Sequence, residues 1–207
     1  MRKLGRSIFL LCLALAGGAN AVSAQSPAIR VQVYDYARLD PGALRQFISY
    51  LEELWDRTGL PGQVSLCRGA LELSCEGQPP TPEPLVVRLL PGDAKVANNA
   101  RRPPLGQSLL GTEGGGYASV YVDAVKSESA AANVSWVMVL AHATSHELGH
   151  LLLGTQAHTP NGLMKANWDR PDYQAIAQNR CHFTQQQIRQ LSRRYGTSLN
   201  LRAQKGR

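Results

Sequence analysis

The feature that most constrains this chain is a pair of histidines, His146 and His150, with Glu147 directly after the first. Residues four apart on an α-helix lie one above the other on one face, so both imidazoles can reach one metal ion. Glu147 lies about 100° round the helix from His146, where its carboxylate can hold a water molecule without binding the ion. This spacing predicts a zinc-binding helix with Glu147 as a general base.

A third zinc ligand must come from outside this helical face, because catalytic zinc sites use three protein ligands and a water molecule. No glutamate follows Glu147 in the chain, which excludes a distant glutamate ligand. The nearest candidate is His158, eight residues beyond His150. Gly154 lies between them and can take the left-handed conformation that ends a helix and turns the chain back. We therefore predict His146, His150 and His158 as the ligands.

His142 continues the same series one helical turn earlier. The eight residues from His142 to His150 span about 12 Å of helix, which is too far for both to bind one ion at about 2 Å. We expect His142 to be a packed or hydrogen-bonded histidine one turn before the site.

These residues resemble the metzincin family of zinc peptidases, which carry His-Glu-x-x-His-x-x-Gly-x-x-His and a methionine turn under the metal. Here the glycine comes one residue later and the third histidine two residues later, and Gly162-Leu163-Met164 matches the methionine turn. No tyrosine stands two residues after Met164, so the extra tyrosine ligand of astacin-like members is not expected. The resemblance is strongest over residues 142–168.

The resemblance implies an α/β (α+β) fold with a twisted mixed sheet, a buried zinc helix and a C-terminal helix after the methionine turn. It also implies a zinc-dependent metalloendopeptidase that acts on peptides or proteins. The three histidines would hold Zn²⁺ as neutral imidazoles, and Met164 would form a hydrophobic floor below them. Glu147 would take a proton from the attacking water and pass it to the leaving amine.

By its order along the chain, residues 118–125 resemble the metzincin strand just before the zinc helix. In that family this strand is a sheet edge that pairs with extended substrate. An ordinary edge strand that binds no ligand is the alternative interpretation.

A second functional hypothesis is a secreted zinc-binding domain without catalytic activity, which binds a partner protein or peptide through its cleft. The intact Glu147 argues against it, because a non-catalytic relative could lose this residue freely. The altered ligand spacing favours it. So does the short stretch before the first expected strand, which leaves no room for a folded inhibitory segment.

Residues 1–24 have the features of a secretory signal peptide: an early cluster of positive charge, a short apolar run and small residues at the cleavage position. The apolar run is too short for a membrane span. We expect residues 25–207 to form a single catalytic domain that is secreted or periplasmic.

The charge balance is mild after signal cleavage. The whole chain has a net charge of +7, and three cations of residues 1–24 leave with the signal, so the mature value is +4. No basic residues alternate with aromatic ones, so we expect no nucleic-acid partner. We also expect no membrane contact in the mature protein, and a monomer.

Three cysteines remain outside the signal segment: Cys67, Cys75 and Cys181. In an oxidising compartment two of them should pair. Cys67 and Cys75 are close in sequence, so we predict a disulfide between them and a buried thiol at Cys181.

The remaining pattern alternates between strand and helix periods. Residues 91–117 are rich in glycine and proline, so they are expected to form a long loop, either a functional rim or a plain surface loop. Asp40 before Pro41 predicts a helix start, and Thr184 with Gln187 predicts a capping box. The expected strands cover residues 28–36, 64–67, 85–90 and 118–125, and the expected helices run from Pro41 to Gly59, over residues 134–153 and from Thr184 to Gly196.

Overall fold

The computed structural model describes residues 29–60, 62–67, 75, 84–92, 103–111 and 116–195. The expected signal segment, residues 1–24, lies outside these residues. Within the described ranges, none of the helices has the length and apolar character needed to cross a membrane.

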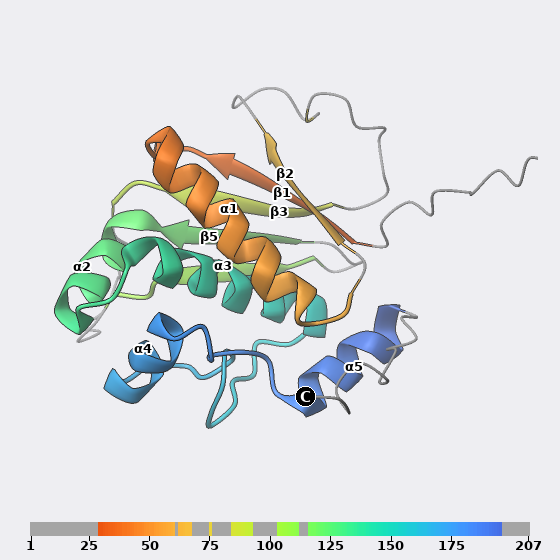
Figure 1. Ribbon diagram of the computed structural model, residues 1–207. Helices are drawn as coiled ribbons and strands as arrows, with labels where there is room; N and C mark the ends of the chain where they lie inside the picture. The colour runs from red at the N-terminus through yellow and green to blue at the C-terminus, as the bar shows by residue number, and fades with distance from the viewer. Residues whose placement is uncertain are drawn as a thin grey trace, which may run out of the picture.

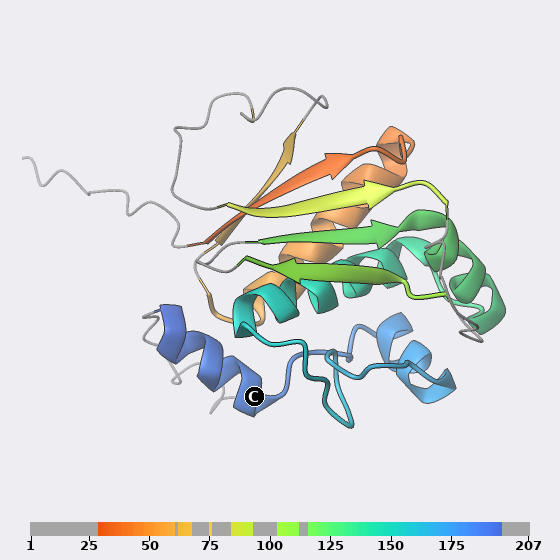
Figure 2. The ribbon, with the colours of Figure 1, turned by 180° about the vertical axis from the view of Figure 1, so that it is seen from behind.

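The centre of the fold is a twisted five-stranded sheet with the strand order β2-β1-β3-β5-β4 (Figure 2). β1, β2, β3 and β5 run parallel to one another, and β4 runs antiparallel to its neighbour β5. The sheet is therefore mixed, as predicted. The strands are β1 (Ile29–Asp35), β2 (Gly62–Cys67), β3 (Leu85–Leu90), β4 (Gly106–Leu110) and β5 (Gly116–Tyr121).

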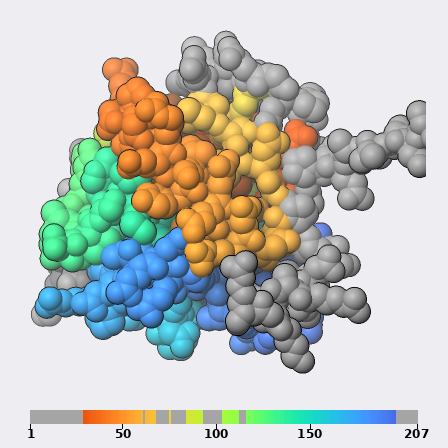
Figure 3. Space-filling view, viewed as in Figure 1, coloured from red at the N-terminus to blue at the C-terminus, as the bar shows by residue number. Residues whose placement is uncertain are grey.

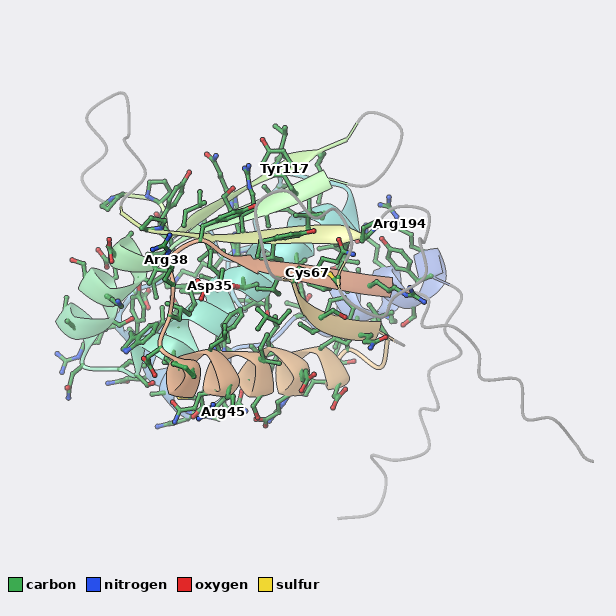
Figure 4. All side chains as sticks on the ribbon, turned by 90° about the horizontal axis from the view of Figure 1, so that it is seen from above. Asp35, Arg38, Arg45, Cys67, Tyr117 and Arg194 are labelled. Carbon is green, nitrogen blue, oxygen red and sulfur yellow. A yellow bond between two sulfur atoms is a disulfide. The ribbon has the colours of Figure 1, made fainter. Side chains whose placement is uncertain are left out.

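Two helices, α1 (Pro41–Asp56) and α3 (Trp136–Leu153), cover one face of this sheet (Figure 1). α1 begins as predicted, because the Asp40 carboxylate accepts hydrogen bonds from the N–H groups of Gly42 and Ala43. Figure 3 shows that α1 covers α3 from the solvent side. The opposite face of the sheet carries Tyr117, which points away from α1 in Figure 4.

α3 is the central helix of the molecule. Every residue from Val139 to Leu153 is buried, because the sheet, α1, α2 (Val122–Ala132) and the C-terminal segment pack around it. The helix ends at Gly154, whose φ of 67° is left-handed, as predicted. The apolar composition of α3 is that of a helix buried on all sides.

The predictions for residues 91–117 and 118–125 were partly wrong. Residues 118–121 form a strand as predicted, and residues 93–102 and 112–115 of the expected loop lie outside the described residues. The supposed loop contains β4 and the start of β5, while β5 ends at Tyr121 and α2 follows at once. Val122 and Val125 were assigned to a strand, but they are buried on one face of α2 together with Ser129. Their spacing of three and four residues is helical.

The position of the sheet edge was also predicted wrongly. β5 lies between β3 and β4, so both of its sides are paired. The strand at the free edge beside α3 is β4. β4 comes before β5 in the chain but lies outside it in the sheet, because the two strands pair antiparallel. The order of elements along the sequence does not reveal this arrangement.

After Gly154 the chain forms a lower part below α3, with helices α4 (Arg170–Ala177) and α5 (Gln185–Tyr195) (Figure 1). α4 was not predicted. It begins with Asp169 as its N-cap, in a capping box with Asp172. The predicted capping box of α5 is confirmed, because Thr184 and Gln187 each bond the backbone N–H of the other.

The cysteines are arranged as predicted. Cys67 at the end of β2 is joined to Cys75 by a disulfide. Cys181 is a buried free thiol in the described part of the chain, and burial raises its pKa to about 12. An un-ionised thiol of this kind is a poor nucleophile, so Cys181 is a packing residue.

Candidate active site

α3 presents His146 and His150 on one face with their outer ring nitrogens converging. His146 Nδ1 lies 2.7 Å from the carbonyl oxygen of Leu163, and His150 Nδ1 lies 2.8 Å from that of Thr155. The two Nε2 atoms face each other at 3.1 Å. Both rings are therefore oriented by backbone carbonyls of the segment that follows the helix.

His158 approaches the same point from the loop after Gly154. One ligand nitrogen of each histidine lies within 4.8 Å of the other two. The His158 ring centroid is 5.3 Å from that of His146 and 4.8 Å from that of His150. The structure thus brings the three predicted ligands together, with His146 and His150 buried and His158 exposed.

The hydrogen-bonding pattern of His146 and His150 fits a cation. Each Nδ1 faces a carbonyl acceptor, so each Nδ1 carries the ring proton and each Nε2 carries a lone pair. Two lone pairs at 3.1 Å repel each other unless a positive charge lies between them. Nitrogen ligands of a tetrahedral zinc ion lie about 3.3 Å apart, which matches this separation.

The surroundings favour neutral imidazoles. Burial lowers the pKa of His146 to about 4, and it lowers the pKa of His150 as well. The neighbouring histidines add to the shift in both cases. Neutral imidazole is the form that binds a metal ion, so the buried pair is suited to hold zinc.

Glu147 lies beside the histidine cluster and contributes no atom to it. Glu147 is 7% exposed, and its carboxylate lies against Gly106 of the edge strand β4. Burial raises the pKa of Glu147 to about 7, and a hydrogen bond with the Ser108 side chain acts in the opposite direction. An ionisable group at this place, beside the three histidines and lining the cleft, can exchange a proton with a water molecule bound there.

Met164 is fully buried below the histidines. A side chain at Gly149, which lies between His146 and His150 on α3, would collide with the Met164 sulfur. The turn is fixed on both sides, because Thr159 N donates to Met164 O and Leu163 N donates to His182 O, each over 2.9 Å. The structure thus places Met164 against the helix that carries His146 and His150.

The remaining histidines lie elsewhere. His142 is 1% exposed and its Nδ1 lies 2.8 Å from Met138 O, so it is the packed histidine that was expected. His182 lies 3.0 Å from Arg57. Asp169, another polar residue near the site, pairs with Lys165 over 2.8 Å.

The cluster opens into a cleft of about 510 Å³. β4 and the residues before it form one wall, and the segment from Lys165 to Trp168 forms the other. The Trp168 ring packs edge-on against His146 at 6.0 Å and against Tyr173 at 6.1 Å. Sequence analysis assigned no role to β4, Trp168 or Tyr173. The sequence of β4, Gly-Gln-Ser-Leu-Leu, has no alternation of apolar and polar residues that would have marked it as a strand.

A buried helix with converging histidines, a neighbouring edge strand and a methionine turn below them define a metzincin-like arrangement. The structure is similar to the crystal structure of archaemetzincin from Methanopyrus kandleri, with a TM-score of 0.51 and 15% identity over 82% of this chain and 96% of that chain. This similarity confirms the predicted fold class. Neither a protein-family model nor any curated protein sequence matches the chain.

Proposed function

We propose that this protein is a secreted zinc-dependent metalloendopeptidase that hydrolyses peptide bonds. The observation that carries the proposal is the approach of the His146 and His150 Nε2 atoms to 3.1 Å, while the Nδ1 atom of each ring faces a backbone carbonyl. His158 completes a three-ligand set, and Glu147 stands next to it. This combination of three neutral ligands and an adjacent carboxylate is the arrangement needed for metal-assisted hydrolysis.

In this mechanism the chain supplies orientation and proton transfer. Leu163 O and Thr155 O hold the two buried imidazoles in the tautomer that leaves Nε2 free. Zinc, when bound, polarises the scissile carbonyl and lowers the pKa of water towards neutrality. Glu147 accepts the proton of the attacking water and later gives it to the leaving amine. Met164 has no chemical step and supports the helix from below.

The substrate would lie along β4. Leu105 O accepts a hydrogen bond from Tyr121 N, so Leu105 and every second residue after it turn their backbone groups towards β5. Gly106 and Ser108 therefore turn their N–H and C=O groups to the free edge of the sheet. An extended peptide can add to such an edge as a further strand. β4 takes the role that sequence analysis gave to residues 118–125.

The disulfide between Cys67 and Cys75 supports secretion or export to the periplasm, because such bonds persist in oxidising compartments. We propose peptides or proteins as the only macromolecular partners of a monomeric chain. Neither a nucleic acid nor a membrane surface is part of this function.

The test combines metal analysis of the purified mature chain with cleavage of a mixed peptide library. We expect one zinc per chain and cleavage at neutral pH. Glu147→Gln keeps the size of the side chain but removes the proton acceptor, so it should retain zinc and lose about 10²–10⁴-fold in cleavage rate. A zinc-loaded chain that cleaves nothing would favour the non-catalytic peptide-binding domain. An unchanged rate in Glu147→Gln would reveal a contaminating protease.

A further inference from the structure

One side chain crosses the cleft beside the metal ligands. Gln156, in the loop between His150 and His158, donates a hydrogen bond from Nε2 to Ser108 O on β4 over 3.2 Å. The Ser108 hydroxyl lies 3.5 Å from the same nitrogen. The loop and the edge strand are thus connected across the cleft by a side chain that is itself exposed.

The loop holds Gln156 in this position from both sides. Gly154 N and Thr155 N both donate to His150 O, over 2.9 Å and 3.2 Å. Ala157 N donates to the Thr155 hydroxyl over 3.1 Å. Gln156 lies between these fixed points, in a segment two residues longer than the metzincin spacing between the second and third histidines.

The acceptor that Gln156 occupies is part of the free sheet edge. In an antiparallel pair, a residue that faces away from its partner strand offers both its N–H and its C=O to a further strand. Ser108 is such a residue, and Gln156 already bonds its C=O. Gly106, which lies against Glu147, is the neighbouring residue of the same kind.

We propose that Gln156 is a specificity-determining residue that closes the cleft at Ser108. A bound peptide pairs freely with Gly106, but it pairs with Ser108 only after it displaces the Gln156 amide. This inference rests on the proposed function. Substrate residues on the Gly106 side of the metal are therefore recognised more strongly than residues on the Ser108 side.

The consequence can be measured as peptide affinity. A net hydrogen bond contributes about 0.5–1.5 kcal/mol, so its removal should tighten binding of a displacing peptide by about two- to tenfold. Peptides that are too short to pair with Ser108 should bind no more tightly after the Gln156 hydrogen bond is removed. A change in protein stability would alter the affinity for long and shortened peptides alike. An affinity gain that is confined to long peptides therefore identifies this role of Gln156.

The experiment uses the zinc-loaded mature chain carrying Glu147→Gln, which binds without cleavage. The probes are peptides that share the sequence cleaved in the library and are shortened stepwise from either end. Peptide binding is measured by fluorescence anisotropy for this parent protein and for its Gln156→Ala and Gln156→Met variants. Methionine keeps the length of the side chain and removes the donor. Gln190→Ala, an exposed glutamine on α5, is the control.

We expect both Gln156 variants to bind long peptides about two- to tenfold more tightly than the parent, with shortening from one end abolishing the gain. In the free parent, NMR should show a slowly exchanging Gln156 side-chain amide, unlike that of Gln190. Equal binding by parent and variants, or a freely exchanging Gln156 amide, would overturn this inference alone. Absence of peptide binding by every protein would overturn the proposed function as well.

Discussion

Gly106 on β4 lies so close to Glu147 that a β-carbon added to the glycine would stand 2.7 Å from Cγ and 2.9 Å from Oε1 of the glutamate. Gly106→Ala should therefore displace the carboxylate while leaving the histidines in place. We expect full zinc content and a loss of at least about tenfold in kcat/KM, because a misplaced catalytic group is costly. Metal analysis and peptide cleavage measure the two effects. Undiminished cleavage would show that Glu147 tolerates the change.

The third ligand is tested by comparing two histidines. His158→Ala should lower zinc affinity much as His150→Ala does, because each removes one bond from a three-ligand site. His182→Ala is the matched control, since His182 bonds Arg57 and lies outside the cluster. Competition with a chromophoric chelator measures the affinities. Tightly held, stoichiometric zinc in His158→Ala would exclude His158 as a ligand.

The contact between Gly149 and Met164 predicts that Gly149→Ala lowers the stability of the protein, whereas glycine to alanine in a helix usually raises it. Glycine to alanine inside a helix ordinarily stabilises by about 1 kcal/mol. At Gly149 the new methyl group meets the Met164 sulfur and the Phe183 ring, so Gly149→Ala should destabilise by about 1–3 kcal/mol. Urea unfolding of Gly149→Ala, alone and combined with Met164→Ala, measures the change. Stabilisation in the single variant would contradict the packing described above.

His142 predicts a pH dependence of stability. Burial lowers its pKa to about 4, and Arg57 and His182 act in the same direction. In the unfolded chain the His142 imidazole binds a proton below about pH 6.5, whereas in the folded chain it does so only below about pH 4. The contribution of neutral His142 to the free energy of unfolding is therefore fully present above pH 6.5. It is lost as the pH falls towards 4, by about 3 kcal/mol in total.

The matched variant for this prediction is His142→Phe, which fills the site without titrating. Urea unfolding at several pH values between 7.5 and 4 should give a steeper loss of unfolding free energy in the parent than in the variant. Groups common to both proteins cancel in the comparison. Parallel curves would show that His142 does not bind a proton on unfolding in this range.

The cysteine arrangement predicts a simple chemical result. Mass mapping of the purified protein without reduction should recover Cys67 and Cys75 as a linked pair. Cys181 should react with a thiol reagent only after denaturation, because it is buried. A bond from Cys181 to either partner would instead connect the lower part to the sheet.

The zinc site was predictable because its determinants are local. His146, Glu147 and His150 lie within five consecutive residues of one helix, and Gly154 turns the chain back to His158. The edge of the sheet was not predictable, since the direction of β4 depends on a hairpin and on pairing with β5. Val122 and Val125 fit a strand or a helix until their neighbours are known, and only packing against α3 decides between them.

The hydrogen bonds from His146 to Leu163 and from His150 to Thr155 also set an order of events in assembly. A helix alone would leave both rings free to rotate and to exchange tautomers. The lower part must dock before the two Nε2 atoms become fixed as a pair. Tight zinc uptake should thus be a late step, which marks a chain that has completed its tertiary structure.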